Sequence, residues 1–302
     1  MIKVHINRKP VEGPWGGGNM WIKSAYDLLP RHDIKIVEIN EDPDAIIIAG
    51  LGPETNSISA LQAIQYKKWA ALKGKIVKLM LRVNENDARK GTTGVDETLR
   101  NISVHIDYTV FVSQWLLQYF ENFGWNCKNK KFIHNGVDGR VFYSQKEKNG
   151  EKIKIVTHHW SDNYMKGFDV YEEIDKWVKD RSDFSFTYIG RDRGTFKNTI
   201  HIPPLFGKEL GDELSRYDVY VSASRFDPGP NHVLESLSCG IPTYVHADSG
   251  GAVEFAGNQN SYKNSEEILN ILLSKKYNKN TWVPPTWEEC MAKFADSIKE
   301  IL

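Results

Sequence analysis

Short apolar runs alternate with amphipathic segments along almost the whole of this chain, and one polar stretch interrupts the pattern near its middle. In the first half, the runs at residues 2–6, 34–39, 45–49, 76–81, 108–112 and 132–134 predict strands. Segments 57–73 and 114–123 predict helices, and the apolar face of the first is expected to comprise Leu61, Ile64, Trp69 and Leu72. Such alternation predicts a parallel sheet with helices on both faces.

The polar stretch at 144–154 predicts a linker, after which the alternation resumes. Strands are expected at 153–158, 184–189, 219–222 and 241–245, and helices at 168–179, 208–217 and 232–238, with two more after Gly250. We therefore expect one domain over 1–145 and another over 146–286, with a last helix at 287–302 that returns to pack on the first. In open parallel sheets, ligands bind beyond the carboxyl ends of the strands, so the loops that follow strands are where a site is expected.

Charge and cysteine content exclude several classes of protein. The 39 basic side chains equal the 39 acidic ones, whereas a protein that binds nucleic acid usually carries a basic excess. Three scattered cysteines indicate neither a disulfide framework nor a zinc site, so we expect a reducing, cytoplasmic setting. No apolar stretch is long enough to span a membrane, and the N-terminus lacks the apolar core of a signal peptide. Peripheral membrane contact stays open, although no strongly basic amphipathic helix indicates it.

The segment 222–257, SASRFDPGPNHVLESLSCGIPTYVHADSGGAVEFAG, is the most informative. A strand ends near Ser222, a loop follows, and a helix opens near Asn231. Free N–H groups at a helix N-terminus favour a diphosphate. Glu235 lies about one turn inside that helix, where a carboxylate can accept hydrogen bonds from a ribose diol, and Asp227 can reach sugar hydroxyls. A capped surface helix with two solvated acids is an equally good interpretation of these residues alone.

The same segment resembles the donor-binding signature of the retaining glycosyltransferases of family 4. That signature is an acid, seven residues and a glutamate, followed by a Gly-Ile-Pro strand; here it comprises Asp227, Glu235 and SLSCGIP. The resemblance implies the GT-B fold, an α/β architecture of two Rossmann-like doubly wound parallel-sheet domains facing each other across a cleft. It further implies that Asp227 contacts the donor sugar, that Glu235 holds the ribose, and that Gly229, Asn231 and His232 contact the donor.

Two departures from the family pattern concern the donor sugar. The first acid is aspartate where the family usually has glutamate, and Pro230 replaces a glycine of the loop. Proline has no N–H to offer a phosphate, so Asn231 and His232 are expected to supply the donors. The implied donor is a UDP- or GDP-sugar, and no cofactor or bound metal is implied.

A second segment, VTHHWSDNYMKGFD at 156–169, places a lysine and a glycine before a helix. Lys166 alone is more readily explained as a solvated side chain, but the family carries a lysine here that neutralises the leaving diphosphate. The arginine that the family has five positions earlier is Ser161 in this chain, and we take Arg191 as a candidate replacement. His158 is a candidate sugar contact, since neighbouring strand residues point to opposite faces and one of His158 and His159 should face the cleft.

Two loops of the first domain are further candidates. The glycines of GPWGGGNM let a backbone approach a ligand closely, and in the family a glycine loop here faces the donor phosphates and the acceptor, so Gly16, Gly17 and Gly18 are candidates. In the loop LRVNENDARK, Asn84 and Asp87 are candidate contacts of donor or acceptor, and a polar surface loop explains them equally well. Asp42 and Asp44 resemble a metal-binding Asp-x-Asp motif, but they precede a strand and are expected to form a turn.

Two smaller segments also match the family, VFVSQWLLQYF and FIHNGVDGRVF. Together these resemblances imply a hexosyltransferase-like enzyme that moves a sugar from a nucleotide diphosphate to an acceptor hydroxyl with retention of configuration. The acceptor could be a glycan, a lipid-linked glycan, a protein or a small molecule. A sugar-nucleotide epimerase or a phosphorylase on the same fold, and a non-catalytic sugar-nucleotide or glycan-binding protein, remain alternatives because fold does not fix function.

Overall fold

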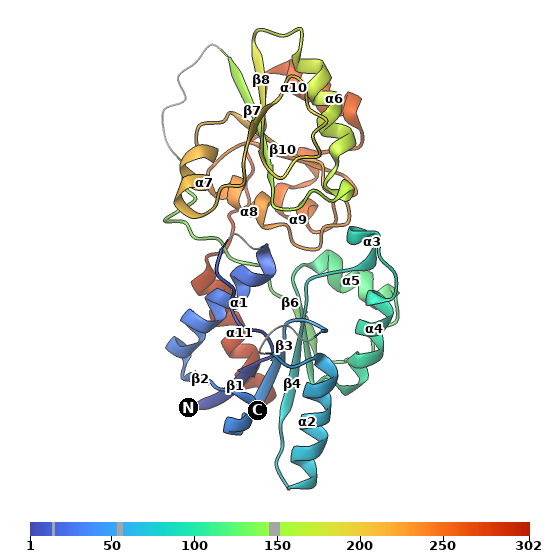
Figure 1. The fold of residues 1–302 in the computed structure, drawn as a ribbon, viewed down its shortest axis with the longest axis vertical. Helices are drawn as coiled ribbons and strands as arrows, with labels where there is room; N and C mark the ends of the chain where they lie inside the picture. Colours follow the sequence, from blue (N-terminus) through green and yellow to red (C-terminus); the bar gives the residue numbers. More distant parts are fainter. Residues whose placement is uncertain (14–15, 53–56, 145–151) are drawn as a thin grey trace. The chain divides into compact units, whose positions relative to one another are not determined.

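The computed structural model describes residues 1–13, 16–52, 57–144 and 152–302, and contacts divide them into two compact units (Figure 1). The first unit comprises Met1–Asp87, Thr92–Gly136 and Pro285–Leu302, and the second comprises Ala88–Gly91 and Val137–Pro284. Residues 137–144 belong to the second unit because Val137 and Phe142 are part of one of its cores, so the division comes before the expected one at 145. Most of the predicted linker lies outside the described residues.

The first unit is built on a six-stranded parallel sheet in the order β2-β1-β3-β4-β5-β6. Its strands are β1 (Ile2–Ile6), β2 (Ile34–Ile36), β3 (Ala45–Ile48), β4 (Lys78–Val83), β5 (Tyr108–Phe111) and β6 (Lys130–Phe132). Two predicted strands differ in position: β4 begins two residues later than expected, and β6 ends where we expected its start. The strand order reverses at β1 and β3, which is where ligands bind in doubly wound sheets.

Helices cover both faces of this sheet. They are α1 (Gly17–Leu28), α2 (Ala60–Leu72), α4 (Val95–Ile102), α5 (Gln114–Asn122) and α11 (Trp287–Ile301). The short helix α3 (Asp87–Lys90) follows β4 and, apart from Asp87, belongs to the second unit. Side chains of β3 alternate between two cores, since Ala45 and Ile47 pack with α1 and α11, whereas Ile46 and Ile48 pack with α2, α4 and α5. The ring of Phe294 on α11 meets the ring of Trp21 on α1 edge to face, 5.0 Å between centroids. Helix α11 thus completes one core of the first unit.

The apolar face that we predicted for α2 is wrong at three of its four positions. Ile64 is buried, but Leu61, Trp69 and Leu72 are 62%, 49% and 89% exposed. The helix packs on the sheet through Ala60, Ala63, Ile64 and Ala70 instead. Small side chains let the helix lie close to the sheet, and a pattern of large apolar residues cannot reveal this.

The second unit holds another six-stranded parallel sheet, in the order β12-β11-β10-β7-β8-β9. Its strands are β7 (Ile153–His159), β8 (Phe184–Gly190), β9 (Ile200–Ile202), β10 (Val219–Ser222), β11 (Thr243–His246) and β12 (Ser261–Tyr262). Counted from β7, this order is that of the Rossmann fold, and it reverses between β7 and β10. The edge strands β9 and β12 were not predicted, because three and two residues are too short for a periodic pattern.

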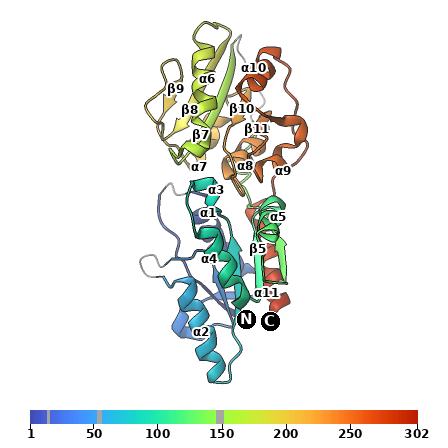
Figure 2. The same ribbon diagram turned by 90° about the vertical axis from the view of Figure 1, so that its right-hand side faces the viewer.

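Helices of the second unit lie on both faces of its sheet (Figure 2). They are α6 (Phe168–Val178), α7 (Gly207–Leu214), α8 (Asn231–Ser238), α9 (Ala252–Ala256) and α10 (Ser265–Ser274). Side chains of α6 and α10 share one core, and those of α7, α8 and α9 form two smaller clusters. The predicted α/β class is confirmed by this pair of doubly wound parallel sheets. Within the described residues, no helix is long and apolar enough to cross a membrane.

Candidate functional site

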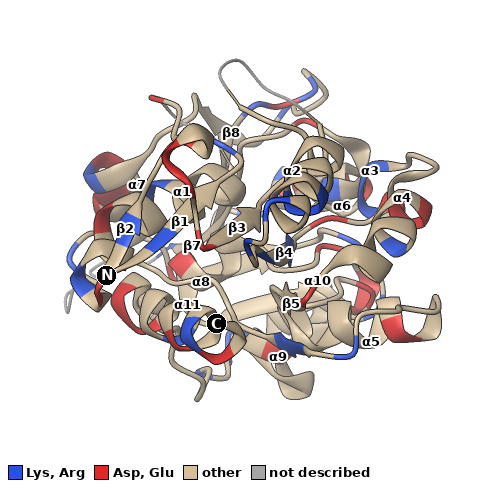
Figure 3. Ribbon diagram, turned by 90° about the horizontal axis from the view of Figure 1, so that it is seen from below, with Lys and Arg blue, Asp and Glu red and all other residues tan. Residues whose placement is uncertain are grey.

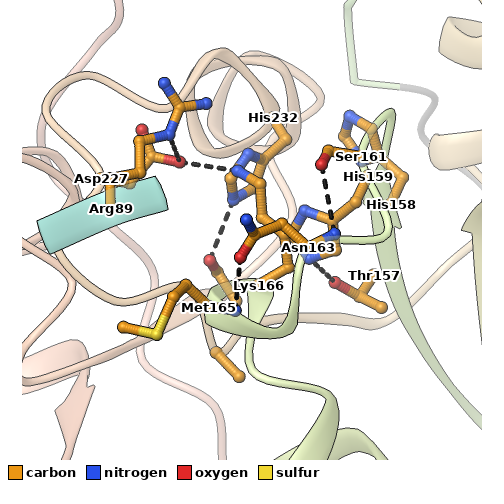
Figure 4. Close-up of polar contacts among 12 residues, drawn as sticks. Arg89, Thr157, His158, His159, Ser161, Asn163, Met165, Lys166, Asp227 and His232 are labelled. Carbon is orange, nitrogen blue, oxygen red and sulfur yellow. Dashed lines mark hydrogen bonds and ion pairs between the residues drawn. The ribbon is translucent and has the colours of Figure 1, made fainter. Parts of the chain in front are cut away.

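The side chains of Lys166 and Asp227 meet at the carboxyl edge of the second sheet. Lys166 follows β7, and Asp227 follows β10, the two strands between which the strand order reverses. The Lys166 ammonium donates to Oδ2 of Asp227 over 2.7 Å, and Nε of Arg89 lies 3.6 Å from the same oxygen (Figure 4). Arg89 belongs to the segment Ala88–Gly91, whose contacts place it in the second unit. One buried carboxylate therefore holds two cations together.

Close backbone packing fixes Lys166. The turn η4 (Tyr164–Lys166) is capped by the side chain of Asn163, which accepts from the Met165 N–H. Gly167 then adopts φ +87°, and a Cβ at this position would lie 2.2 Å from the carbonyl oxygen of Ala223. Only glycine lets α6 start so close to the end of β10. The lysine–glycine pair read from the sequence thus serves to bring the two strand ends into contact.

The loop that carries Asp227 is held by the loop after β11. The backbone N–H of Asp227 donates to Ser249 O, and the Asp227 carbonyl accepts from the Gly251 N–H, both over 3.0 Å. Just before it, Phe226 adopts φ +52°, a conformation that costs a non-glycine residue roughly 1 kcal/mol or more. These contacts hold the carboxylate in the interior, where Asp227 is only 2% exposed.

Burial and charge pairing act in opposite directions on the pKa values of the Asp227 carboxyl and the Lys166 ammonium. Burial alone would raise the pKa of the Asp227 carboxyl, but Arg89 and Lys166 outweigh it and lower that pKa to about 2. Burial lowers the pKa of the Lys166 ammonium, and Asp227 offsets part of that shift. At neutral pH the carboxylate is ionised and neutralises cations that would otherwise stand together in the interior.

A pocket of about 230 Å³ opens beside the cluster. It is lined by Arg89, Lys90, Ser161, Asn163, Met165, Lys166, Arg225 and Asp227. Four basic side chains thus line it against one acidic one, and Arg225 is in addition paired through both terminal nitrogens with Asp169. Even with Asp169 counted beside Asp227, four cations stand against two carboxylates, so this lining attracts a polyanion.

Helix α8 begins just beyond Asp227. Gly229 is half-buried in the connecting loop, and Pro230 is the N-cap residue, so the first N–H groups of the helix come from Asn231 and His232. Glu235 lies one turn inside and is 19% exposed, and its Oε2 lies 2.8 Å from Nε2 of His158 on β7. The second predicted acid therefore stands on the same edge of the sheet as the first, with an imidazole that orients it.

The two neighbouring histidines of β7 point to different helices. His158 meets Glu235 of α8, whereas Nε2 of His159 lies 2.7 Å from the hydroxyl of Tyr171 on α6. The ring of His232 packs edge to face on that of His159, 4.6 Å between centroids, and bonds Ser222. Burial holds the pKa of both His159 and His232 well below the usual range, so these rings are neutral at pH 7. The neutral His232 ring adds no positive charge at this edge, and the residue has its backbone N–H in the first turn of α8.

Arg191 does not line the pocket. Its guanidinium lies 4.1 Å from the centre of the Trp160 ring, so it stacks on that indole beyond the ends of β7 and β8. Ser161 does line the pocket, and its hydroxyl accepts from the Asn163 N–H. The structure therefore brings Arg89, Lys90 and Arg225, rather than Arg191, to Lys166.

Sequence reasoning missed these three basic residues. Arg89 and Lys90 stand in the segment LRVNENDARK, in which only Asn84 and Asp87 are candidates from the sequence alone. Arg225 stands two residues before Asp227, and that proximity to the signature was a usable signal. No pattern in the chain could connect Arg89 with a residue 138 positions later, since only folding brings Ala88–Gly91 to the second unit.

The candidates of the first unit gather at the carboxyl edge of its own sheet. Gly16 caps α1 and Gly17 begins it, so the glycine run forms a helix N-terminus after β1 rather than an open loop. A Cβ on Gly18 would lie 3.4 Å from Nδ2 of Asn84, which follows β4. Asp87 is used differently, since its carboxylate accepts from the backbone N–H groups of Val95 and Asp96 at the start of α4.

Asp42 and Asp44 form the turn that we expected. Asp42 has φ +65° and pairs with Lys75, while Asp44 accepts from the Lys3 N–H at the amino edge of the sheet. Among the described residues, no group of three or more histidine, cysteine or acidic side chains is arranged to hold a metal ion.

Comparison with known proteins gives a result at the level of fold. No protein-family model matches the chain, and none of the curated proteins matches it. Solved structures do match, over nearly the whole chain. HepE of Anabaena, in complex with UDP and glucose, matches with a TM-score of 0.71 at 11% identity and covers 99% of this chain and 100% of its own.

Two further structures agree. Sucrose-phosphate synthase of Thermosynechococcus elongatus has a TM-score of 0.69 at 10% identity, over 100% of this chain and 99% of its own. The lipopolysaccharide outer core galactosyltransferase WaaB has a TM-score of 0.66 at 12% identity, over 100% of both chains. The similarity covers both sheets in order, and the GT-B fold expected from the sequence is confirmed.

Proposed function

We propose that this chain is a glycosyltransferase that takes a sugar from a nucleotide diphosphate and passes it to an acceptor hydroxyl. The observation that carries the proposal is the pocket beside the Lys166–Asp227 pair, which is lined by four basic side chains and by Asp227, four residues before the first residue of α8. A diphosphate is the common anion that such a combination of cations and helix N–H groups suits.

Transfer would depend on neutralising the departing diphosphate. Lys166 and Arg89 are placed to take up the charge that develops on its oxygens as the glycosidic bond breaks, and the first N–H groups of α8 add a partial positive charge. In this proposal Arg89 is the second cation, in place of the arginine missing at position 161. Because these cations can balance the charge of the diphosphate, we propose that the reaction needs no divalent metal ion.

Glu235 is proposed to hold the ribose. Its carboxylate is partly exposed and is oriented by His158, so it can accept from both ribose hydroxyls while keeping its helix position. Asp227 is proposed to accept from hydroxyls of the donor sugar once the diphosphate has drawn Lys166 and Arg89 away from it. After the exchange the two cations have the diphosphate as their partner, and the carboxylate has hydroxyl donors in place of the cations.

The class of donor is proposed from the structural neighbours. HepE is described with UDP and with UDP-glucose, and the pneumococcal O-GlcNAc transferase GtfA with UDP and GlcNAc. We therefore propose a UDP-hexose as the donor, with a GDP-sugar as the alternative to be tested beside it. Retention at the anomeric carbon is proposed from the resemblance of the Asp227 to Glu235 segment to family 4, and the configuration of the product would test it.

Thermal unfolding with a panel of nucleoside diphosphates and their sugars tests the donor site. A ligand at about 100 times its Kd adds roughly 2.7 kcal/mol, which should raise Tm by several degrees. We expect UDP to raise Tm of the wild type and Glu235→Ala to lose most of that rise, while Glu266→Ala, an exposed glutamate of α10, keeps it. An equal rise in Glu235→Ala would contradict the assignment, and no rise with any nucleotide would contradict the proposed function.

Transfer itself is tested by donor turnover with an acceptor mixture. Lys166→Ala should lower kcat by about 10²-fold or more, because charge on the leaving group is stabilised mainly in the transition state. Binding of the uncharged nucleoside should change little, and Lys263→Ala, an exposed lysine, should behave as wild type. A protein that binds UDP but turns over no donor would instead be a sugar-nucleotide binding module.

A further inference from the structure

Helix α2 presents large apolar side chains to solvent. Leu61 and Leu72 are 62% and 89% exposed, Trp69 is 49% exposed, and Ile76 in the turn after the helix is 78% exposed. Trp69 lies eight positions after Leu61, and Leu72 lies three positions after Trp69, so the three side chains share one side of the helix along about 16 Å of its length. We call these four residues, together with Lys68 and Lys73, the outer face of α2.

The fold does not need this face. The opposite side of α2 packs on the sheet through Ala60, Ala63, Ile64 and Ala70, and these are at most 4% exposed. A surface helix of a globular protein normally carries one apolar stripe, toward the core. A second stripe that water contacts is unfavourable by itself, and exposed apolar surface of this kind usually marks an interaction site.

The charged residues of the sequence in and around α2 are all basic. From residue 55 to residue 84 the chain has five lysines and one arginine but no aspartate or glutamate. Figure 3 shows basic residues on α2 and on the turn that follows it, and no acidic ones there. Lys67 and Lys75 pair with Asp107 and Asp42 of neighbouring segments. Lys68 and Lys73 are exposed on the face itself.

Trp69 and Lys73 form a pair suited to the boundary between an apolar and a polar phase. The Lys73 ammonium lies 4.1 Å from the centre of the Trp69 ring, one turn further along the helix. An indole prefers the level of lipid headgroups, and a lysine stem can lie along apolar surface while its ammonium stays in water. The 3₁₀ turn η3 (Ser103–His105) adjoins this region, since Lys67 donates to His105 O, and it adds Val104, which is 59% exposed.

We propose that the outer face of α2 binds peripherally to the surface of a bilayer that contains anionic lipid. Leu61, Leu72 and Ile76 would enter the boundary between headgroups and acyl chains, and Lys68 and Lys73 would meet the lipid phosphates. A second copy of this chain fits the face less well, because two such faces would bring like charges together. The proposal stands independently of the proposed function.

The outer face lies apart from the candidate site residues of its own unit. Gly18 and Asn84 stand at the carboxyl edge of the first sheet. Helix α2 starts after β3 and runs back toward the start of β4, so Leu72 and Ile76 lie toward the amino edge. Substitutions there test binding to lipid without altering residues that we assign to substrate.

The experiment is flotation of the full chain with vesicles of phosphatidylcholine alone or mixed with phosphatidylglycerol, at low and high salt. We expect binding to the anionic vesicles only, and weaker binding at high salt because the charge attraction is screened. Leu72→Asp and the pair Lys68→Glu with Lys73→Glu should each reduce partitioning by roughly tenfold or more, since each basic residue near an anionic surface contributes about fivefold. Val283→Asp and the pair Lys276→Glu with Lys279→Glu, at exposed positions of the second unit, are matched controls and should bind as wild type.

Unchanged Tm in each variant shows that a loss of binding is not a loss of folding. Equal binding to both kinds of vesicle, no binding to either, or an equal loss in the controls would overturn the proposal. So would a wild-type dimer, seen by sedimentation, that Leu72→Asp converts into a monomer without any binding to vesicles. That last result would assign the face to a second copy of the chain.

Discussion

At the scale of single residues, the Asp227 carboxylate is the feature on which the site depends. It is buried, it pairs with Lys166, and Arg89 lies near the same oxygen. Removing its charge without changing its shape leaves two cations close together in the interior. A buried pair that loses one partner typically costs about 3–5 kcal/mol, because the remaining charge is uncompensated.

The substitution Asp227→Asn should therefore have opposite effects on folding and on anion binding. We expect it to lower the free energy of unfolding by about 3–5 kcal/mol, because two cations lose the same partner. Binding of free UDP should become tighter by several-fold, because Lys166 and Arg89 no longer have to leave a carboxylate. Transfer should fall, since the sugar contact is lost. Chemical unfolding, calorimetric UDP titration and turnover measure the three effects.

Asp180→Asn, an exposed carboxylate at the end of α6, is the control and should change none of them. Weaker binding of UDP by Asp227→Asn would mean that the carboxylate does not compete with the diphosphate for Lys166, and it would contradict the exchange of partners that we propose.

Acid unfolding gives a second measure of the same carboxylate. Its pKa of about 2 in the folded chain lies below the ordinary value of 3.8, so the folded state binds the proton less readily than the unfolded state. The stability that this difference supplies is present above about pH 4 and is lost as pH falls from there toward 2. Between pH 4 and 2 the free energy of unfolding should fall more steeply for wild type than for Asp227→Asn. Parallel curves would mean that the pKa is not depressed.

How much of the site could be predicted from sequence differs from residue to residue. Asp227, Glu235 and Lys166 were predictable because each has a fixed spacing from a glycine, a proline or another acid in a local motif. Arg89 was not, because its contact with Asp227 depends on tertiary structure alone. Asp87 in the same loop was a candidate ligand contact, and in the structure its carboxylate accepts from N–H groups at the start of α4, because an acid in a polar loop can cap a helix.

At the scale of elements, glycines decide where helices can start. Gly167 joins η4 to α6 at φ +87°, in contact with the carbonyl of Ala223 at the end of β10. Glycines also explain a missed helix, because three in succession suggested a loop where α1 begins. Helix α2 shows the converse error, since large apolar residues suggested a buried face that alanines provide. The alternation of strands and helices was predictable; which side of a helix meets the sheet was not.

Gly167→Ala should destabilise the second unit and disrupt the site together. The added Cβ would meet backbone rather than a flexible side chain, and the positive φ is unfavourable for alanine, so we expect a loss of about 2–5 kcal/mol. Lys166 should move away from Asp227, with a loss of UDP binding of tenfold or more. Unfolding curves and UDP titration measure both effects.

Gly194→Ala separates the effect of the positive φ from the effect of the close backbone contact. Gly194 also has a positive φ, +70°, but an added Cβ meets nothing within 4 Å there. We expect a loss of only about 1 kcal/mol and unchanged UDP binding. If both variants bind UDP equally, the close approach of Gly167 to Ala223 does not position the lysine.

At the scale of the whole molecule, the second unit is nearly continuous in sequence and the first is not. Apart from Ala88–Gly91, the second unit is the single segment Val137–Pro284. The first unit comprises residues that precede this segment in the sequence and residues that follow it. Trp287, Phe294 and Ile298 of α11 share a core with β1 and α1. The two units should therefore differ in whether they fold alone.

A fragment of residues 137–284 should fold cooperatively and bind UDP through Glu235, although more weakly than the full chain because Arg89 and Lys90 are absent. A fragment of residues 1–136 should not fold cooperatively, because one side of its sheet lacks α11. Addition of residues 285–302 through a short linker should restore a cooperative transition. Circular dichroism and UDP titration measure these outcomes, and cooperative unfolding of 1–136 alone would contradict them.

The late position of α11 sets an order for events on the ribosome. Strand β1 is made long before α11, and the core around Val4 and Ile6 is not complete until residues 287–301 have been made. Synthesis proceeds at about 5–20 residues per second, so β1 waits at least roughly 15 seconds for its last partner. The second unit can fold within that interval. The side of the first sheet that α11 covers therefore stays partly exposed in the nascent chain during that interval, and we expect chaperones to bind there.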